Sequence, residues 1–250
     1  MTAQNWTEQN RDEQNRDEQK WYGTLGVFDL ETTGIDVRTS RIVSANVSVI
    51  DATGSVIERT DWLADPGIDI PPQASAVHGI TTERARAEGR PAAEVVAGIV
   101  AAIRAIFDRG LALTVYNAPY DLSLLSHEAI RHGVPALEDP SPIIDPLVID
   151  KAIDRYRKGK RTLEAAALVY GVDLTDAHDA GADAIAAGRV AQAIAARHPS
   201  ELDLTAEELH ARQVEWSAQQ SASFAEYMRR THNPDFVETS GWPVRSGPQR

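Results

Sequence analysis

Two carboxylates near the start of the chain stand two residues apart, directly after an apolar run. Asp29 and Glu31 lie in residues 25–34, which read Leu-Gly-Val-Phe-Asp-Leu-Glu-Thr-Thr-Gly. Alternate side chains of a strand point to the same face, so on a strand these two carboxylates project together. Two like charges held that close repel, and burial strengthens the repulsion. A solvated strand end would tolerate the pair, and otherwise a hard divalent cation such as Mg2+ or Mn2+ would relieve the repulsion.

A third acid, Asp121, follows a second apolar stretch. Residues 116–121 read Tyr-Asn-Ala-Pro-Tyr-Asp, at a junction where a strand is expected to give way to a helix. The junction places Asp121 in the first helical turn, near the carboxyl end of the strand. Structural roles compete with chemistry here, because Asn117 suits a helix N-cap and the helix dipole favours acids in the first turn.

A histidine and a fourth acid, His178 and Asp183, stand five residues apart further along. His178 falls just before a predicted helix and Asp183 falls within it, so both can reach one cleft. Histidine is the side chain best suited to take a proton near neutral pH. The alternative is a loop histidine beside an exposed helix acid, and Asp176 and Asp179 are nearby acids whose spacing fits the pattern less well.

The elements that must position these residues begin with strands. Residues 24–64 are typical of three antiparallel strands, with the second over 41–51 and the third over 56–63. Prolines and glycines at 66–67 and 71–72 predict a loop.

The remaining domain alternates helices with short strands. A helix is expected to open with Pro91 at its first position and to stop at Gly110. The order predicts an α/β fold, a mixed sheet covered by helices. The further expected elements are short strands over 111–116 and 142–145 and helices over 119–132, 146–155, 162–170 and 180–197.

Outside a domain expected at 21–198, the chain has two polar ends. Residues 1–20 contain a tandem repeat, Asn-Arg-Asp-Glu-Gln, and are predicted to be disordered because they offer almost no apolar surface. Residues 199–250 are expected to hold a helix at about 205–230 and a loose tail that Phe236 and Trp242 could anchor. The helix is predicted to dock on the domain or on a partner through one stripe: Leu209, Trp216, Phe224, Tyr227 and Met228.

Composition narrows the class of protein. The 250 residues include no cysteine, so thiolate metal sites are excluded, and the net charge of −12 argues against a generic nucleic-acid coat. No apolar run approaches the ~20 residues that span a bilayer, so we expect a cytoplasmic protein with no membrane contact. One basic strip departs from the acidic average, and it is either a phosphate-contacting surface or a solvated helix end: Lys151, Arg155, Arg157, Lys158, Lys160 and Arg161.

Taken in order, these motifs resemble the DEDD-type 3′–5′ exonucleases with a catalytic histidine. That superfamily, which includes the epsilon subunit of bacterial DNA polymerase III, ribonuclease T and oligoribonuclease, carries D-x-E, then Asn followed by an acid, then H-x-x-x-x-D. The resemblance covers about residues 24–197. The strings Phe-Asp-Leu-Glu-Thr-Thr-Gly at 28–34 and Val-His-Gly-Ile at 77–80 are similar to the epsilon branch.

The resemblance implies a ribonuclease H-like fold and a two-metal mechanism. Asp29, Glu31 and Asp183 would ligate one Mg2+ or Mn2+ ion, and Asp29 with phosphate oxygens would hold a second, with Asp121 acting through water. His178 would deprotonate the attacking water, and the product would be a nucleoside 5′-monophosphate. The terminal nucleotide would be contacted by three further residues: Thr33, His78 and Asn117.

The sequence leaves three functions open. We expect a 3′–5′ exonuclease acting on single-stranded DNA ends, and the alternatives are an RNA-directed exonuclease or oligoribonuclease and a non-catalytic module. A DNA polymerase or another protein could bind residues 205–230. Structural roles are expected for Asp145, as a helix N-cap before Pro146, and for Trp62, packed under the sheet. Other histidines are expected to be ordinary surface residues: His127, His132, His198, His210 and His232.

Overall fold

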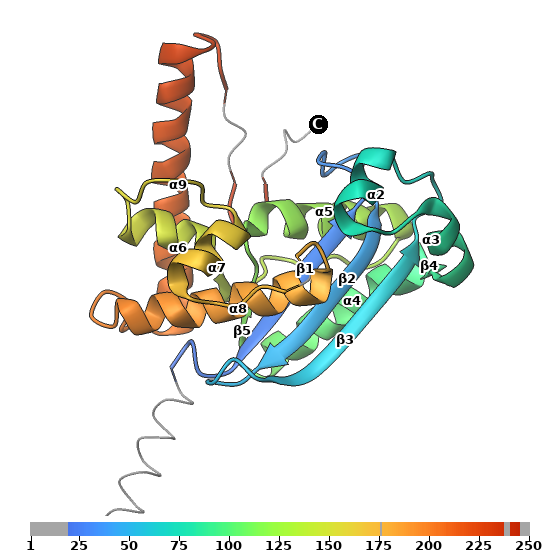
Figure 1. The fold of residues 1–250 in the computed structure, drawn as a ribbon, viewed down its shortest axis with the longest axis horizontal. Coiled ribbons are helices and arrows are strands. Elements are labelled where there is room, and N and C mark those ends of the chain that lie inside the picture. Colours follow the sequence, from blue (N-terminus) through green and yellow to red (C-terminus); the bar gives the residue numbers. More distant parts are fainter. Residues whose placement is uncertain (1–19, 176, 238–240, 246–250) are drawn as a thin grey trace, which may run out of the picture.

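A twisted six-stranded sheet forms the centre of the computed structural model, which describes residues 20–175, 177–237 and 241–245 (Figure 1). The strand order among these residues is β4-β3-β2-β1-β5-β6. The first three strands pair antiparallel, and β5 and β6 join β1 in parallel. This is the mixed sheet that the sequence predicted. The strands are β1 (Leu25–Thr32), β2 (Ile42–Ile50), β3 (Val56–Asp65), β4 (Arg90–Pro91), β5 (Ala112–Thr114) and β6 (Ile143–Ile144).

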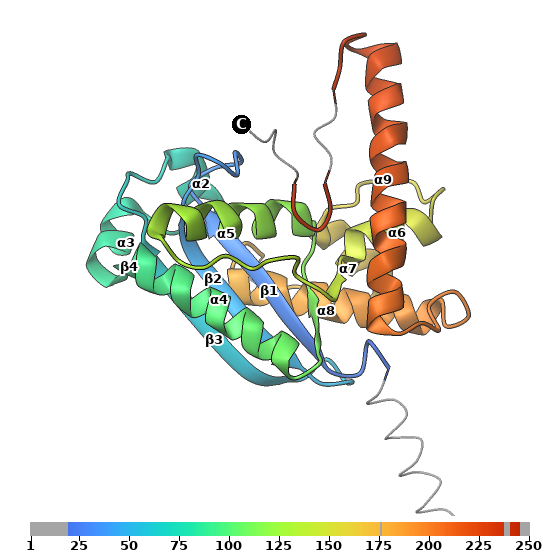
Figure 2. The same ribbon diagram turned by 180° about the vertical axis from the view of Figure 1, so that it is seen from behind.

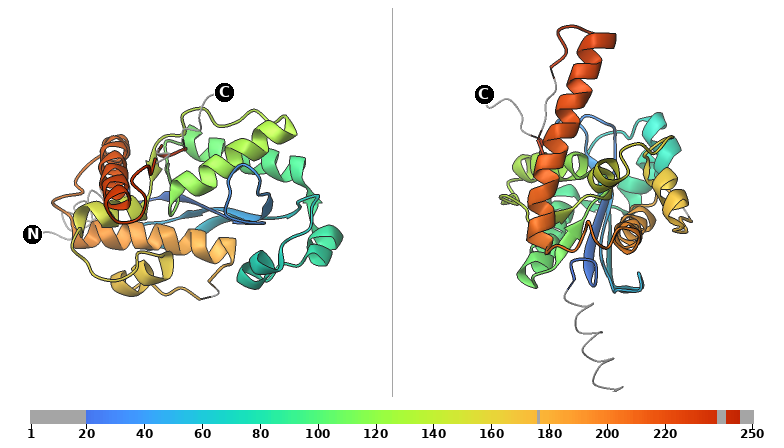
Figure 3. Two further views of the ribbon diagram at one scale, coloured as in Figure 1. Left: turned by 90° about the horizontal axis from the view of Figure 1, so that it is seen from above. Right: turned by 90° about the vertical axis from the view of Figure 1, so that its left-hand side faces the viewer.

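Helices cover both faces of the sheet, because β1 is apolar on both of its sides. Leu25 and Val27 point to one face and Phe28 and Leu30 to the other, as the two-residue period of a strand requires. Helices α4 (Ala92–Asp108) and α5 (Ala118–His132) pack on the Phe28 face, which Figure 2 presents toward the viewer. The opposite face is covered by α7 (Leu163–Tyr170) and α8 (Ala180–Arg197), so the sheet lies between two helical layers (Figure 3, left).

Helices α6 (Pro146–Ile153) and α9 (Ala206–Thr231) lie together at the β6 edge of the sheet. The first half of α9 docks through Gln213, which is fully buried. Its side chain accepts the N–H of Asp145 at 2.7 Å and donates to the carbonyl of Ile143 at 2.9 Å. The second half projects beyond the rest of the molecule (Figure 3, right). Among the described residues, no helix is both long enough and apolar enough to span a bilayer.

The predictions about α9 and its contacts were confirmed only in part. The expected apolar stripe docks on the domain near its start, where Leu209 is fully buried and Trp216 packs against the core. Phe224 and Tyr227 are exposed, and the other buried positions of the helix are Gln213 and Ala225. The prediction for His210 was wrong. His210 is not a surface residue. Its Nδ1 accepts the N–H of Ile143 at 3.0 Å, and its ring lies 4.9 Å from that of Trp242. The side-chain hydrogen bonds of His210 and Gln213 therefore hold α9 against the end of β6.

The region between β3 and α4 also departs from expectation. Two short helices, α2 (Pro72–His78) and α3 (Thr82–Glu88), follow the loop signals at 66–67 and 71–72, where the sequence predicted no helix. They bury a single helical residue, Ala85, so they carry almost no apolar period. Pro91 precedes α4 in the short β4 rather than opening the helix. Trp62 is buried against α4, as predicted, where a Cβ at Gly98 would lie 2.8 Å from its indole nitrogen.

Candidate active site

A gap in the sheet beside β1 creates the space for the site. The parallel pairing of β1 with β5 ends at Val27 and Thr114, because β5 is only three residues long. From Phe28 onward this side of β1 has no neighbouring strand among the described residues. The N–H of Leu30 instead donates to Asp121 Oδ1 at 3.2 Å. The gap thus lets side chains from the two opposite helical layers meet next to β1.

Four carboxylates converge there. Asp29 and Glu31 come from the α8-facing side of β1, Asp121 comes from the first turn of α5, and Asp183 comes from the first turn of α8. All four line one cleft of about 410 Å³. The resemblance of the motifs to the DEDD-type exonucleases implied this set, and the fold brings its members together.

The four acids perturb one another. Burial, followed by the charges of Asp183 and Asp121, raises the pKa of Glu31 to about 8. Burial also raises the pKa of Asp121 to about 8, against the opposing effect of the N–H groups that it accepts. The pKa of Asp29 is raised well above its ordinary value by burial and by the three neighbouring acids, and that of Asp183 is raised by burial. Such a cluster favours a bound cation, because a cation makes the charged forms favourable.

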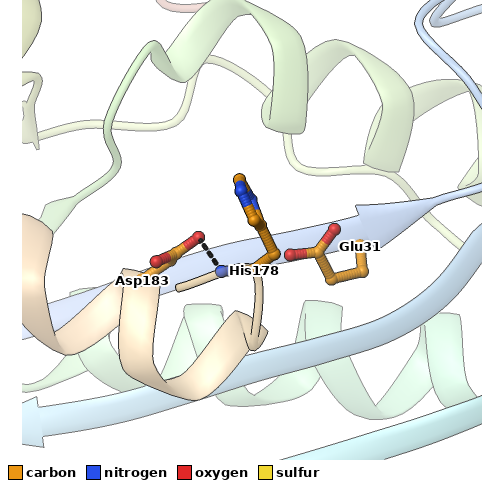
Figure 4. A group of neighbouring side chains, drawn as sticks. All are labelled: Glu31, His178 and Asp183. Carbon is orange, nitrogen blue, oxygen red and sulfur yellow. Dashed lines mark hydrogen bonds between the residues drawn. The ribbon is translucent and has the colours of Figure 1, made fainter. Parts of the chain in front are cut away.

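His178 lies between Glu31 and Asp183 (Figure 4), although it is not among the described residues that line the cleft. Its φ of 69° lies in the left-handed region, which non-glycine residues rarely adopt. Its backbone N–H donates to Asp183 Oδ2 at 3.1 Å, and this bond holds the strained turn. The exposed imidazole places Nε2 3.7 Å from Glu164 Oε1, on α7.

The donor set suits a divalent metal ion. One ligand atom each of Glu31, His178 and Asp183 lies within 4.8 Å of the others. The second oxygen of Asp183, Oδ1, is buried and has no hydrogen-bond partner among the described residues. Carboxylate oxygens left without donors are the ligands that Mg2+ and Mn2+ prefer.

Asp145 organises the neighbouring β5–α5 junction. It is fully buried and caps α6 by accepting the N–H of Leu147, as predicted. It also accepts the N–H groups of Asn117 and Ala118 at 3.0 Å and the indole N–H of Trp242 at 3.3 Å. Asn117 therefore sits at the N-cap of α5 with φ 62° but without a side-chain cap bond, and its exposed side chain lines the cleft.

Thr33 and His78, the other two residues expected to contact substrate, lie outside the described lining of the cleft. Thr33 is buried, and its Oγ1 accepts the N–H of Arg41 at 2.9 Å. His78 is half-buried, with Nδ1 accepting the N–H of Ile80 at 3.1 Å, and burial lowers its pKa. Asp179 caps α8 through the N–H of Ala182, whereas Asp176 lies outside the described residues.

The basic strip divides into two groups. Arg157 and Arg161 pair with the buried carboxylate of Asp150, both at 2.6 Å, so they serve the fold. The other four residues of the strip are exposed: Lys151, Arg155, Lys158 and Lys160. The sequence could not reveal this division, because Asp150 and its arginines are separated by a loop.

Sequence reasoning overlooked Tyr120. Its hydroxyl donates to the carbonyl of Gly34 at 2.6 Å, and the ring lines the cleft. This contact ties the start of α5 to the turn after β1. Its position next to Asp121 was the only available signal.

Comparisons with known proteins agree with this arrangement. A family model described as "Exonuclease" matches residues 27–191. DNA polymerase III PolC-type from Streptococcus thermophilus is 29% identical over 168 residues, covering 67% of this chain and 11% of the relative. The corresponding protein of Lacticaseibacillus paracasei is 28% identical over 169 residues, with the same coverage. The chain thus spans about a tenth of the length of these curated relatives.

Solved structures share the fold. Escherichia coli exonuclease I in complex with a dA16 oligonucleotide superposes with a TM-score of 0.60 at 23% identity, covering 72% of this chain and 42% of that one. Exonuclease I from Methylocaldum szegediense gives a TM-score of 0.58 at 23% identity, with the same coverage. The ribonuclease H-like fold is therefore confirmed.

Proposed function

The chain belongs to the exonuclease family, and from that premise we propose that it is a metal-dependent 3′–5′ exonuclease. On this proposal it releases nucleoside 5′-monophosphates from the 3′ ends of single-stranded DNA in the cytoplasm. One observation carries the proposal: four carboxylates with raised pKa values meet in one cleft, and one of their oxygens is buried without a partner. A fold gains nothing in stability from such a cluster, whereas a cation-dependent phosphodiesterase needs it.

We assign each residue a role in binding metal or nucleotide. Asp29, Glu31 and Asp183 would hold one divalent ion, and Asp29 would share a second, with Asp121 acting through water. When bound, the ions would supply positive charge that stabilises the attacking and leaving oxygens of an in-line displacement. Asn117, Thr33 and His78 would contact the terminal nucleotide.

His178 is the base that we propose. A ring nitrogen of His178 would accept a proton from the attacking water while the water oxygen bonds to phosphorus. The bond from phosphorus to the 3′ oxygen of the preceding nucleotide breaks, and that oxygen takes a proton from solvent water and leaves as a hydroxyl. Glu164, 3.7 Å from Nε2, would stabilise the resulting imidazolium.

DNA is the substrate we favour over RNA because the matched relatives are DNA polymerases by name. The exonuclease I structures, which hold oligodeoxynucleotides, support the same choice. A DNA polymerase or another protein would dock on the projecting half of α9, where Tyr227 is exposed. A non-catalytic role would leave the repelling carboxylates without purpose.

The test is degradation of matched single strands labelled at their 5′ ends. With Mg2+ or Mn2+, the DNA strand should shorten from its 3′ end, and the RNA strand should shorten at least tenfold more slowly. Asp29→Ala should abolish shortening, whereas Asp108→Asn, an exposed acid at the end of α4, should leave the rate unchanged. Inactivity of the pure protein on both strands with either metal would overturn the proposal, and faster RNA decay would reassign the substrate.

A further inference from the structure

A second and larger groove adjoins the acidic cleft. It has a volume of about 1040 Å³ and lies between α6, α9, the start of α5 and residues 241–245; we call it the α6–α9 groove. It shares Asn117 and Leu147 with the cleft, so the two cavities adjoin each other at the β5–α5 junction. We propose that this groove binds the nucleotides of the substrate strand that precede the scissile one. This inference rests on the proposed function and specifies its substrate path.

The charge of the groove contrasts with that of the chain. Three basic residues line it, although the whole chain carries −12: Lys151 of α6, Arg155 just after α6, and Arg245. Among its described lining residues, Asp145 is the single carboxylate, and its oxygens are occupied by four N–H donors. In the described part of the chain, neither Lys151 nor Arg155 forms an ion pair. A phosphate backbone is the complementary ligand for such a surface.

The walls also carry groups that suit unpaired bases. Trp216 and Phe224 of α9 and Trp242 of the C-terminal segment present aromatic rings. Stacking on aromatic faces is the usual way in which proteins hold single strands without reading their sequence. Ser217 and Ser221 add hydroxyl groups that can donate to phosphate. A groove lined by both basic side chains and aromatic rings favours single-stranded nucleic acid as its ligand over a protein segment.

The C-terminal wall of the groove is fixed in place. The Trp242 indole donates to Asp145 at 3.3 Å and packs 4.9 Å from His210, and the N–H of Arg245 donates to Ser123 Oγ at 2.8 Å. Preformed walls lower the ordering cost of binding. The groove volume also lies at the upper end of small-ligand pockets, which reach about 1000 Å³. A strand several nucleotides long fits such a space better than one small molecule.

This wall is an addition by this chain to the family domain. The family model ends at residue 191, so α9 and residues 241–245 lie outside it. The strand path that we propose therefore depends on elements that the shared fold does not supply.

Binding of a 5′-fluorescein dT12 strand, measured by fluorescence anisotropy in EDTA, tests the proposal. The measurement uses full-length Asp29→Ala protein, so the strand is not degraded. Adding Lys151→Ala with Arg155→Ala should weaken binding at least tenfold. It should also make the negative slope of log affinity against log salt shallower by about 1.4, since each phosphate contact contributes about 0.7.

The matched control is Lys158→Ala with Lys160→Ala, which removes two exposed charges of the same strip outside the groove lining. It should change the affinity less than twofold. Trp216→Leu should weaken binding at least threefold without changing the salt slope, because it removes stacking rather than charge. The groove assignment would be overturned if the two double variants lost DNA affinity equally, or if neither lost any. Hydrolysis is not measured in this assay, so failure of the nuclease test would count against the proposed function separately.

Discussion

At the scale of single residues, Glu31 shows that a side chain proposed to bind metal can destabilise the metal-free fold. Its carboxylate is partly buried, and this burial, followed by the charges of Asp183 and Asp121, raises its pKa to about 8. A neutral residue would fit the same place at lower electrostatic cost. Function and stability therefore pull in opposite directions at this position.

Glu31→Gln should stabilise the metal-free protein and inactivate it. The amide keeps the shape and removes the repulsion, so at pH 8 a gain of about 1 kcal/mol would raise Tm by about 2–4 °C. Activity should fall at least about 100-fold because a metal ligand is lost. Differential scanning calorimetry in EDTA and an exonuclease assay in Mn2+ check both effects. Glu138→Gln, an exposed acid, should change neither, and a lower Tm for Glu31→Gln would contradict the repulsion argument.

The elements that carry the carboxylates could be predicted, because each follows a strong local period or junction. Asp29 and Glu31 alternate on a strand, and Asp121 and Asp183 lie in the first turns of helices. Their grouping in one site was implied by the resemblance to the DEDD-type exonucleases. The four-donor role of Asp145 could not be predicted, because its partner Trp242 is 97 residues away. His210 was misjudged for the same reason, since nothing local marks its bond to Ile143.

At the scale of elements, the position of α8 decides where Asp183 lies. The helix crosses β1 and β2 at Gly188, where a Cβ would lie 2.6 Å from both Val27 and Ile50. The missing side chain allows this close approach. Helix α8 can therefore deliver its first turn into the gap beside β1.

Gly188→Ala should push α8 away from the sheet. Overpacking costs about 1–3 kcal/mol, and the better helix propensity of alanine returns about 0.8–1.0 kcal/mol. We expect Tm to fall by a few degrees and activity to fall further than stability alone explains, because Asp183 moves with the helix. Thermal melts and kcat measured below Tm separate these effects. Ala196→Ser on the exposed side of α8 is the control, and full activity with an unchanged Tm would refute the close-packing explanation.

Gln213 carries the docking of α9. Gln213→Ala leaves the N–H of Asp145 and the carbonyl of Ile143 buried without their partner. Each unsatisfied buried group costs about 1–3 kcal/mol, so a destabilisation of about 2–4 kcal/mol is expected in urea unfolding. Arg212→Ala, at the exposed neighbouring position, should stay within about 0.5 kcal/mol of wild type. A change that small for Gln213→Ala would mean that other contacts hold the helix.

Long apolar elements were the predictable part of the fold. Helices α4 and α8 each bury at least six residues at helical spacing, so their signals were strong. Helices α2 and α3 bury only Ala85 between them, and α9 docks through a buried glutamine. Elements held by polar contacts or short turns leave little periodic signal for sequence reasoning to detect.

At the scale of the whole molecule, the acidic cleft links folding to pH and to metal. The folded pKa values of Glu31 and Asp121 are about 8, whereas unfolded carboxyls titrate near pH ~4. Between these values the folded chain binds more protons than the unfolded chain. The free energy of unfolding therefore decreases as pH rises through this window.

Metal-free protein should accordingly lose Tm between about pH 5 and 8, and Mn2+ should restore it. Metal binds the deprotonated carboxylates, so its stabilisation should be larger at pH 8 than at pH 5, with about 2.7 kcal/mol expected at a concentration 100 times Kd. Thermal melts with EDTA or Mn2+ at each pH measure this. The Asp29→Ala protein should respond less to Mn2+. A metal-free Tm that rises from pH 5 to 8 would contradict the pKa assignment.

The alternation along β1 also separates two ways in which a variant can fail. On the α8-facing side of this strand, Leu25 and Val27 belong to the core, and the next positions, Asp29 and Glu31, belong to the site. In a mutational scan that records cellular abundance and activity together, substitutions at 25 and 27 should deplete the protein. Substitutions at positions 29 and 31 should leave the protein abundant but inactive. The boundary between the two phenotypes should fall between adjacent same-face positions of one strand.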